Sequence, residues 1–304
     1  MKPFSDFQAT VVGGDARQIA VASALIQLFK KVKIFGHPQA MVPNPIESCT
    51  DIVTALADVR VIVLPIGGMD DEGLVRSYQG EHSIDFGKYL SSLPEETLIV
   101  TGSFTNRWLA LAEKLKFKVL QYADDDEIAV LNSIPTAEGA LQIAMEELPI
   151  TIHGSKVVII GFGRVGVTLA RVFKAMGAQV IVSARRKSAL ARALEMGCQA
   201  ILIDSLSEAA GNVDLIINTV PALIIDSGLI AEIQPETLII DLASAPGGTD
   251  FEAAKKRNIK AILTPGLPGL VAPKSAGEIL AATIPKLITD FLQKGVELYE
   301  IFRD

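Results

Sequence analysis

Apolar residues in this chain fall into short runs separated by amphipathic stretches, a pattern that predicts alternating strands and helices. The segment Lys156 to Ile160 is almost continuously apolar, as in strands buried on both faces of a parallel sheet. A glycine-rich turn follows, apolar residues then recur at helical spacing up to Gly177, and Gln179 to Ser183 is again apolar and β-branched. This strand-turn-helix-strand unit organises the carboxyl-terminal half of the chain.

The turn of this unit fits the G-x-G-x-x-G pattern of dinucleotide-binding domains. The first glycine would permit a sharp exit from the strand, the second would let a pyrophosphate approach the backbone at the helix N-terminus, and the third would let the helix lie close to the sheet. A βα turn without a ligand is the alternative, but the strand-helix-strand context favours a dinucleotide site. The predicted contacts here are Gly161, Gly163, Arg164, Val165 and Gly166.

The end of the second strand indicates which dinucleotide binds. NAD-binding domains usually carry an Asp or Glu there, which accepts hydrogen bonds from the ribose 2′-hydroxyl. The segment here reads SARRKS and contains no carboxylate. A hydroxyl and guanidinium groups can bind the extra phosphate of NADP, although a solvated basic turn is the alternative. We therefore predict NADP as the cofactor, with contacts from Ser183, Ala184, Arg185 and Arg186.

Length and composition favour a two-domain folded enzyme. The chain has 304 residues, 49% of them hydrophobic and 21% charged. A net charge of −7 and the lack of a basic stripe argue against a nucleic-acid ligand. The sequence has no long uncharged apolar run and no signal-peptide core, so no membrane segment is predicted. Cys49 and Cys198 lack metal-ligand spacing, so we expect reduced thiols, no metal site and a cytoplasmic location.

The alternation of strands and helices extends along the whole chain. In the amino-terminal half it is interrupted by a polar segment, 69–93, which is predicted to be a long loop or lid with short helical pieces. Further strands are expected at 9–13, 33–35, 60–64, 97–100, 117–120, 199–203, 213–218, 237–241 and 260–263. Together with the two strands of the opening unit, the last four make six, the full count for a doubly wound nucleotide domain.

Two doubly wound parallel-sheet domains of the α/β class follow from this pattern. The segment 132–139 marks the crossing, because Pro135 disfavours helix at Ile134 and Thr136 is a candidate cap for the next helix. We expect a flavodoxin-like substrate domain over 1–132 and a Rossmann NADP-binding domain over 133–284. The amphipathic segment Lys274 to Phe302 is expected to pack back on the first domain, which residues 285–304 would complete.

Strand ends supply the remaining candidate contacts, because ligands of open parallel sheets bind outside the carboxyl ends of the strands. In the second domain, residues after two late strands should surround the nicotinamide: Thr219, Val220, Pro221, Asp241, Ala243 and Ser244. In the first domain, small residues after three strands could line one mouth or merely form turns: Gly13, Gly14, Asp15, Gly67, Gly68, Gly102 and Ser103.

Several segments resemble the A subunit of dipicolinate synthase from endospore-forming bacteria. They are 132–139, 152–155, the glycine turn and, most specifically, DLASAPGGTDF at 241–251 and PGLPGLVAPK at 265–274. The resemblance implies formation of dipicolinate, pyridine-2,6-dicarboxylate, from a dihydrodipicolinate-type intermediate of the lysine pathway during sporulation. It also implies that a flavoprotein-like B subunit is the partner. NADP would accept the hydride, and a homo-oligomer is expected.

A small dicarboxylate substrate requires cations or helix N-termini in an otherwise acidic chain. Lys274, near a helix start, and Arg17, after the first glycine turn, are the leading candidates, although each could be a solvated side chain. Other residues that could face the substrate are Asp15, Gly67, Ser103, Thr136 and Glu138. No residue can be named with a general acid or base role.

Two other functions remain open. D-2-hydroxyacid dehydrogenases share the two-domain plan, but they use a histidine late in the nucleotide domain as proton donor. The histidines here are His37, His82 and His153, and none follows the glycine turn. A non-catalytic NADP-binding regulatory protein that supports a catalytic partner is the other alternative.

Overall fold

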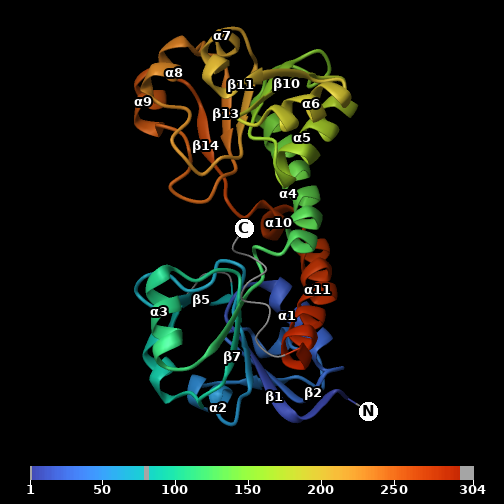
Figure 1. Cartoon of the computed structure of the whole chain (residues 1–304), viewed down its shortest axis with the longest axis vertical. Helices are drawn as coiled ribbons and strands as arrows, with labels where there is room; N and C mark the ends of the chain where they lie inside the picture. Colours follow the sequence, from blue (N-terminus) through green and yellow to red (C-terminus); the bar gives the residue numbers. More distant parts are fainter. Residues whose placement is uncertain (1, 79–81, 295–304) are drawn as a thin grey trace. The chain divides into compact units, whose positions relative to one another are not determined.

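The computed structural model describes residues 2–78 and 82–294 of the chain. They form two compact units, each built on its own parallel sheet (Figure 1). Unit 1 contains residues up to 131 and the segment from Pro273, and unit 2 contains residues 132–272. This confirms the predicted α/β class with two doubly wound domains. No helix among the described residues is long and apolar enough to cross a membrane.

Unit 2 has the six parallel strands expected of a nucleotide-binding domain. Their order is β11-β10-β9-β12-β13-β14, so the strand order reverses between β9 and β12. Two apolar clusters cover opposite faces of the sheet. The strands are β9 (Lys156–Ile160), β10 (Gln179–Ala184), β11 (Gln199–Leu202), β12 (Leu215–Asn218), β13 (Leu238–Asp241) and β14 (Ala261–Leu263). The helices are α5 (Arg164–Ala175), α6 (Lys187–Glu195), α7 (Leu206–Ala210), α8 (Ser227–Glu232), α9 (Phe251–Lys256) and α10 (Leu267–Val271), with the 3₁₀ turn η4 (Ile203–Ser205).

Unit 1 repeats the strand order of unit 2. Its sheet runs β3-β2-β1-β4-β7-β8, all parallel. Numbered along the chain, this order is 3-2-1-4-5-6 rather than the 2-1-3-4-5 of the expected flavodoxin-like domain. The added outer strand is β3, a polar tripeptide that carries no apolar signal. The strands are β1 (Phe4–Val12), β2 (Phe29–Phe35), β3 (Glu47–Cys49), β4 (Val61–Val63), β7 (Leu98–Thr101) and β8 (Lys118–Gln121). The helices are α1 (Ala16–Leu25), α2 (Ile52–Leu56) and α3 (Asn106–Lys114), with the 3₁₀ turn η1 (Gln39–Met41).

The predicted loop at 69–93 contains more structure than expected. Two short strands, β5 (Leu74–Arg76) and β6 (Ser83–Asp85), pair antiparallel, and the 3₁₀ helix η3 (Gly87–Ser92) follows. The Trp108 indole donates a hydrogen bond to the Asp70 carbonyl at 2.7 Å, which ties the segment to α3. The hairpin was not predicted because three-residue strands show no period.

Helix α4 (Asp126–Glu147) runs through the predicted crossing without a break. The expected interruption at Ile134 and cap at Thr136 are therefore wrong: the Thr136 hydroxyl donates to the Asn132 carbonyl, four residues earlier, at 2.7 Å. Pro135 removes one helical N–H, but burial of the α4 alanines in the core of unit 2 outweighs that loss. These alanines are Ala137, Ala140 and Ala144.

Helix α11 (Pro273–Lys294) returns to unit 1 and completes its core, as the fold prediction required. The return begins at Pro273, earlier than the expected residue 285, and the part of the predicted helix beyond 294 lies outside the described residues. The α11 residues in the core of unit 1 are Leu280, Ile284, Ile288 and Phe291. Helix α11 packs on α1, where a Cβ on Gly277 would lie 3.2 Å from the Arg17 Cα.

We predict that Ile284→Ala lowers the free energy of unfolding of unit 1 by about 2–5 kcal/mol, because it leaves a cavity at a fully buried position. Denaturant unfolding followed by the fluorescence of Trp108, the sole tryptophan, measures the change. Lys286→Ala, two residues later on the exposed side of the helix, is the control and should change stability by less than about 1 kcal/mol. Equal effects of the two changes would contradict the packing role of α11.

Candidate functional site

The glycine turn of unit 2 has the geometry of a phosphate cradle. Gly161 has φ +92°, which favours glycine, and a Cβ there would lie 2.3 Å from the Thr219 hydroxyl oxygen. A Cβ on Gly166 would lie 2.1 Å from the Gly161 carbonyl oxygen, so α5 approaches the end of β9 backbone to backbone. Gly163, the N-cap of α5, has no heavy atom within 4 Å of its Cβ position and no side chain caps the helix. The N–H groups of α5 therefore face open space, as a pyrophosphate requires.

The neighbouring residues of the turn flank this space. Arg164 and Gly163 are exposed, and Val165 is half-buried. Arg164 is the first residue of α5, at the helix end that no side chain caps.

Four exposed residues, from Arg185 to Ser188, follow the end of β10. Arg186 is the N-cap of α6, and no side chain caps that helix either. Ala184 is buried, and the buried Ser183 hydroxyl has no hydrogen-bond partner among the described residues. The exposed side chains here are those of Arg185, Arg186, Lys187 and Ser188.

The ends of β12 and β13 form the other side of the cradle. Thr219 donates its hydroxyl to the Ile160 carbonyl at 2.9 Å, Val220 is half-buried, and Pro221 is exposed. Asp241 is fully buried and Ala243 is 4% exposed, whereas Ser244 is exposed. The predicted contacts of this group thus divide into residues that a ligand can touch and residues that hold the loops.

The carboxyl edge of the unit 1 sheet brings its predicted residues together. Strands β1, β4 and β7 are neighbours, so Gly13–Asp15, Gly67–Gly68 and Gly102–Ser103 lie at one edge, as expected. Most of these glycines pack against the neighbouring turns, and a Cβ on Gly68 or Gly102 would meet backbone within 2.0 Å. Gly67 and Ser103 are exposed, so they remain available to a ligand.

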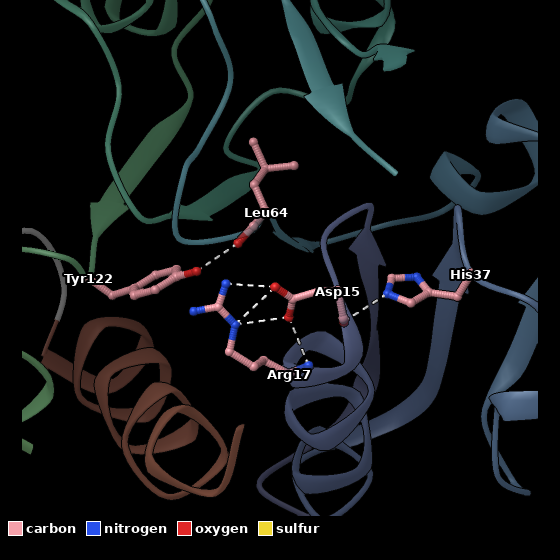
Figure 2. A network of polar contacts seen from close by, with 5 residues as sticks. All are labelled: Asp15, Arg17, His37, Leu64 and Tyr122. Carbon is pink, nitrogen blue, oxygen red and sulfur yellow. Dashed lines mark hydrogen bonds and ion pairs between the residues drawn. The ribbon is translucent and has the colours of Figure 1, made fainter. Parts of the chain in front are cut away.

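Asp15 and Arg17 form a paired site at this edge, where the strand order reverses between β1 and β4. Asp15 caps α1, and its carboxylate accepts hydrogen bonds from Arg17 Nε at 2.9 and 3.1 Å and from Nη2 at 2.7 Å (Figure 2). Burial raises the pKa of Asp15, but the hydrogen bonds and charge of Arg17 outweigh burial, so the pKa lies below its ordinary value. The carboxylate therefore balances part of the Arg17 charge.

Two aromatic residues that the sequence did not indicate accompany this pair (Figure 2). His37 Nε2 lies 3.2 Å from the Asp15 carbonyl oxygen, which can only accept, so Nε2 carries the proton. Burial lowers the pKa of His37, which is neutral at pH 7 with its Nδ1 lone pair buried and unpaired among the described residues. The fully buried Tyr122 donates its hydroxyl to the Leu64 carbonyl at 3.0 Å, and burial raises its pKa. Because His37 follows the end of β2, next to β1, the strand-end rule could have identified it.

The other substrate candidates are spread over the two units. Lys274 is exposed, in the first turn of α11. Gly277, one helical turn later, touches Arg17 at the start of α1, so α1 and α11 begin at the same edge of unit 1. Glu138 is exposed on α4, at a shallow hollow that also includes Met145.

A separate cavity of 670 Å³ in unit 1 lies between the ends of β2 and β3 and the β5–β6 hairpin. His37 and Tyr78 line it, with ring centroids 5.6 Å apart, and Lys88 on its wall pairs with Asp85 at 3.3 Å. It lies away from the point where the strand order reverses, which is next to Asp15 and Arg17.

Family models match both halves of the chain. Residues 8–123 match the N-terminal domain of the dipicolinate synthase A subunit. Residues 136–246 match the NAD binding domain of D-isomer specific 2-hydroxyacid dehydrogenases. The second match agrees with the glycine cradle and shows a nicotinamide dinucleotide-binding domain, without distinguishing NAD from NADP.

Relatives match over nearly the whole length. The dipicolinate synthase A subunit of Bacillus subtilis (strain 168) is 39% identical over 283 residues, which cover 92% of this chain and 95% of that protein. The crystal structure of the dipicolinate synthase A subunit from Bacillus halodurans superposes with a TM-score of 0.88 at 37% identity, covering 94% of this chain and 98% of that one. The crystal structure of the Bacillus subtilis protein gives 0.85 at 36% identity, covering 96% and 99%.

Alanine substitutions in the glycine turn test the cradle. We predict that Gly163→Ala leaves stability unchanged within about 0.5 kcal/mol but weakens dinucleotide binding about ten- to hundredfold, because the methyl group occupies the open space beside the N–H groups. Gly166→Ala should lower both binding and the free energy of unfolding, by about 1–3 kcal/mol, because its Cβ overlaps the Gly161 carbonyl. Calorimetric titration and thermal unfolding measure the two quantities. Normal binding by Gly163→Ala would place the phosphates elsewhere.

Proposed function

Because the chain belongs to the family of dipicolinate synthase A subunits, we propose that it takes part in the NADP-dependent conversion of a dihydrodipicolinate-type intermediate to dipicolinate. The proposal includes a partner B subunit, a cytoplasmic location, a homo-oligomeric state and a role in sporulation. The name of the Bacillus subtilis relative, which identifies it as one lettered subunit of a synthase, supports the existence of a partner.

The open cradle at Gly163 beside the basic end of β10 is the observation that carries the proposal. The segment SARRKS at the end of β10 contains no carboxylate that would repel a 2′-phosphate. Arg185 and Arg186 are exposed and flank the uncapped start of α6. Guanidinium groups and free helix N–H groups both bind phosphate oxygens, which favours NADP over NAD.

The chemistry requires a hydride acceptor. Oxidation of a dihydropyridine to a pyridine removes a hydride and a proton, and oxidised NADP accepts the hydride while the proton leaves to a base or to water. The residues of unit 2 would hold the cofactor through the α5 N–H groups and the basic run.

Unit 1 carries the features that a dicarboxylate needs. Arg17 and Lys274 lie in the first turns of α1 and α11, which begin at the same edge of the sheet. The Lys274 ammonium and the N-terminus of α11 favour anions, and Arg17 adds the part of its charge that the Asp15 carboxylate does not balance. Ser103 and Gly67, both exposed, supply a hydroxyl and free backbone at the same edge.

The structure does not favour a D-2-hydroxyacid dehydrogenase. Reduction of a keto acid needs a proton donor near the nicotinamide. The histidine of unit 2, His153, precedes β9 and lies against Gly177, which precedes β10. It is therefore at the amino edge of the sheet, opposite the cradle.

We predict that Arg185→Ala weakens NADP binding about ten- to hundredfold and changes NAD binding less than about twofold, because it removes charge-assisted hydrogen bonds to the 2′-phosphate alone. Titration with both dinucleotides measures the affinities. Arg192→Ala, in the last turn of α6, is the control and should change neither. Tighter binding of NAD than NADP by the unmodified chain would refute the NADP assignment.

The complete reaction is tested with enzymatically generated hydroxytetrahydrodipicolinate, which gives the dihydrodipicolinate-type intermediate by loss of one water. It is mixed with NADP and this chain, with and without the B subunit. Pyridine absorbance and NADPH fluorescence should rise together in a 1:1 ratio, and Arg185→Ala should lower both rates about tenfold or more at subsaturating NADP. Pyridine formation without NADPH, unaffected by Arg185→Ala, would instead make the chain a non-catalytic NADP-binding regulatory subunit.

A further inference from the structure

The buried side chain of Asp241 is fully occupied by the protein. One carboxyl oxygen accepts hydrogen bonds from Asn218 Nδ2 at 3.0 Å and from the Ala243 amide at 3.1 Å. The other accepts from the Gly248 amide at 2.8 Å and the Thr249 hydroxyl at 2.7 Å. With no exposed surface and four donors, Asp241 has no acceptor left for a ligand.

Asn218 extends this arrangement to the adjacent strand. It pairs with Asp241 in register at the carboxyl ends of β12 and β13. Its Oδ1 accepts from the Val220 amide and its Nδ2 donates to the Val220 carbonyl, both at 3.0 Å. The amides of Ile224 and Ile225 donate to the Gly248 carbonyl at 3.0 and 2.9 Å. The loops 218–225 and 241–249 are thus joined through one buried group, which we call the clasp: Asn218, Asp241 and Thr249.

The clasp lies where the nicotinamide half of a dinucleotide would be. The pyrophosphate cradle is at the end of β9. The basic run that would bind the adenosine ribose is at the end of β10, the neighbour of β9 on one side. The other half of the ligand must extend to the opposite side, over β12 and β13. The clasp is continuous with the cradle, because Thr219 contacts the Cβ position of Gly161. Three residues of the loop between Asp241 and Thr249 are exposed: Ser244, Ala245 and Pro246.

We propose that the clasp is a positioning device for the nicotinamide: Asp241 does not touch the cofactor but fixes the two loops that do. This inference rests on the proposed NADP function and names residues that determine where the reactive end of the cofactor is held. The exposed residues 244–246 and Pro221 are the parts of the loops left to contact the ring and its ribose.

Two substitutions disrupt the clasp without changing its size. Asp241→Asn replaces one acceptor oxygen with an NH₂ group, which must face two donors whichever way the amide is oriented. Thr249→Val removes one hydroxyl donor. The matched control is Thr237→Val, which removes another buried hydroxyl, bonded to the Val213 carbonyl at 2.7 Å, just before β13 at the opposite edge of the sheet.

The test compares NADPH with 2′,5′-ADP, which lacks the nicotinamide, its ribose and the phosphate attached to that ribose. We expect Asp241→Asn to raise the Kd of NADPH at least about tenfold and Thr249→Val roughly threefold, from loss of buried hydrogen bonds. The Kd of 2′,5′-ADP should change less than about twofold in both variants, and Thr237→Val should change neither ligand. The emission of bound NADPH should shift toward that of free NADPH in the two clasp variants only.

Other outcomes separate this inference from the proposed cofactor. If Asp241→Asn does not fold, Thr249→Val against Thr237→Val decides the question, and equal NADPH affinities in these two variants would overturn the clasp. Equal weakening of NADPH and 2′,5′-ADP by Asp241→Asn would also overturn it. If the unmodified chain prefers NADH, the NADP assignment fails, and the same comparison with NADH and ADP still tests the clasp.

Discussion

The dinucleotide half of the molecule depends on the backbone contact between Gly161 and Gly166. No side chain fits between the first turn of α5 and the end of β9, and this contact directs the free N–H groups of the helix toward the carboxyl edge of the sheet. Thr219 packs on Gly161 and bonds to the Ile160 carbonyl, so the β12 loop takes its position from the turn. The hydrogen bond from Asn218 to Asp241 in turn fixes the β13 loop relative to the β12 loop. One close approach thus organises three strand ends.

The two sheets share a strand order, but the helices that follow their first strands, α1 and α5, differ in what occupies their N-termini. In unit 2 the N-cap of α5 is glycine and its N–H groups are free, whereas in unit 1 the Asp15 carboxylate occupies the N-terminus of α1. An acidic cap excludes a phosphate by charge and by volume. The same topology therefore combines one dinucleotide site with one sheet edge of mixed charge, where the Asp15 carboxylate and the Arg17 guanidinium are paired.

The sequence was informative where burial acts over a whole segment and uninformative where contacts are local. The strands of unit 2 were predictable because strands covered on both faces are continuously apolar. Strand β3, with the sequence ESC, and the three-residue strands β5 and β6 carry no such signal. At Pro135 the local rule was overridden by tertiary packing of α4. The candidate site shows the same limit: the strand-end rule located Asp241 and Ser183, but only the three-dimensional structure shows that both side chains point into the protein.

Because α11 belongs to unit 1 but follows unit 2 in the chain, it affects the order in which the two units can fold during synthesis. Domains usually fold from the amino terminus as they leave the ribosome. Here the sheet of unit 1 is synthesised with part of its apolar face uncovered. The α11 residues that complete its core are synthesised only after the whole of unit 2: Leu280, Ile284, Ile288 and Phe291. Unit 2 is continuous from 132 to 272 and can complete its core before α11 appears. Unit 2 can therefore fold first, and the sheet of unit 1 must avoid aggregation until α11 has been synthesised and covers it.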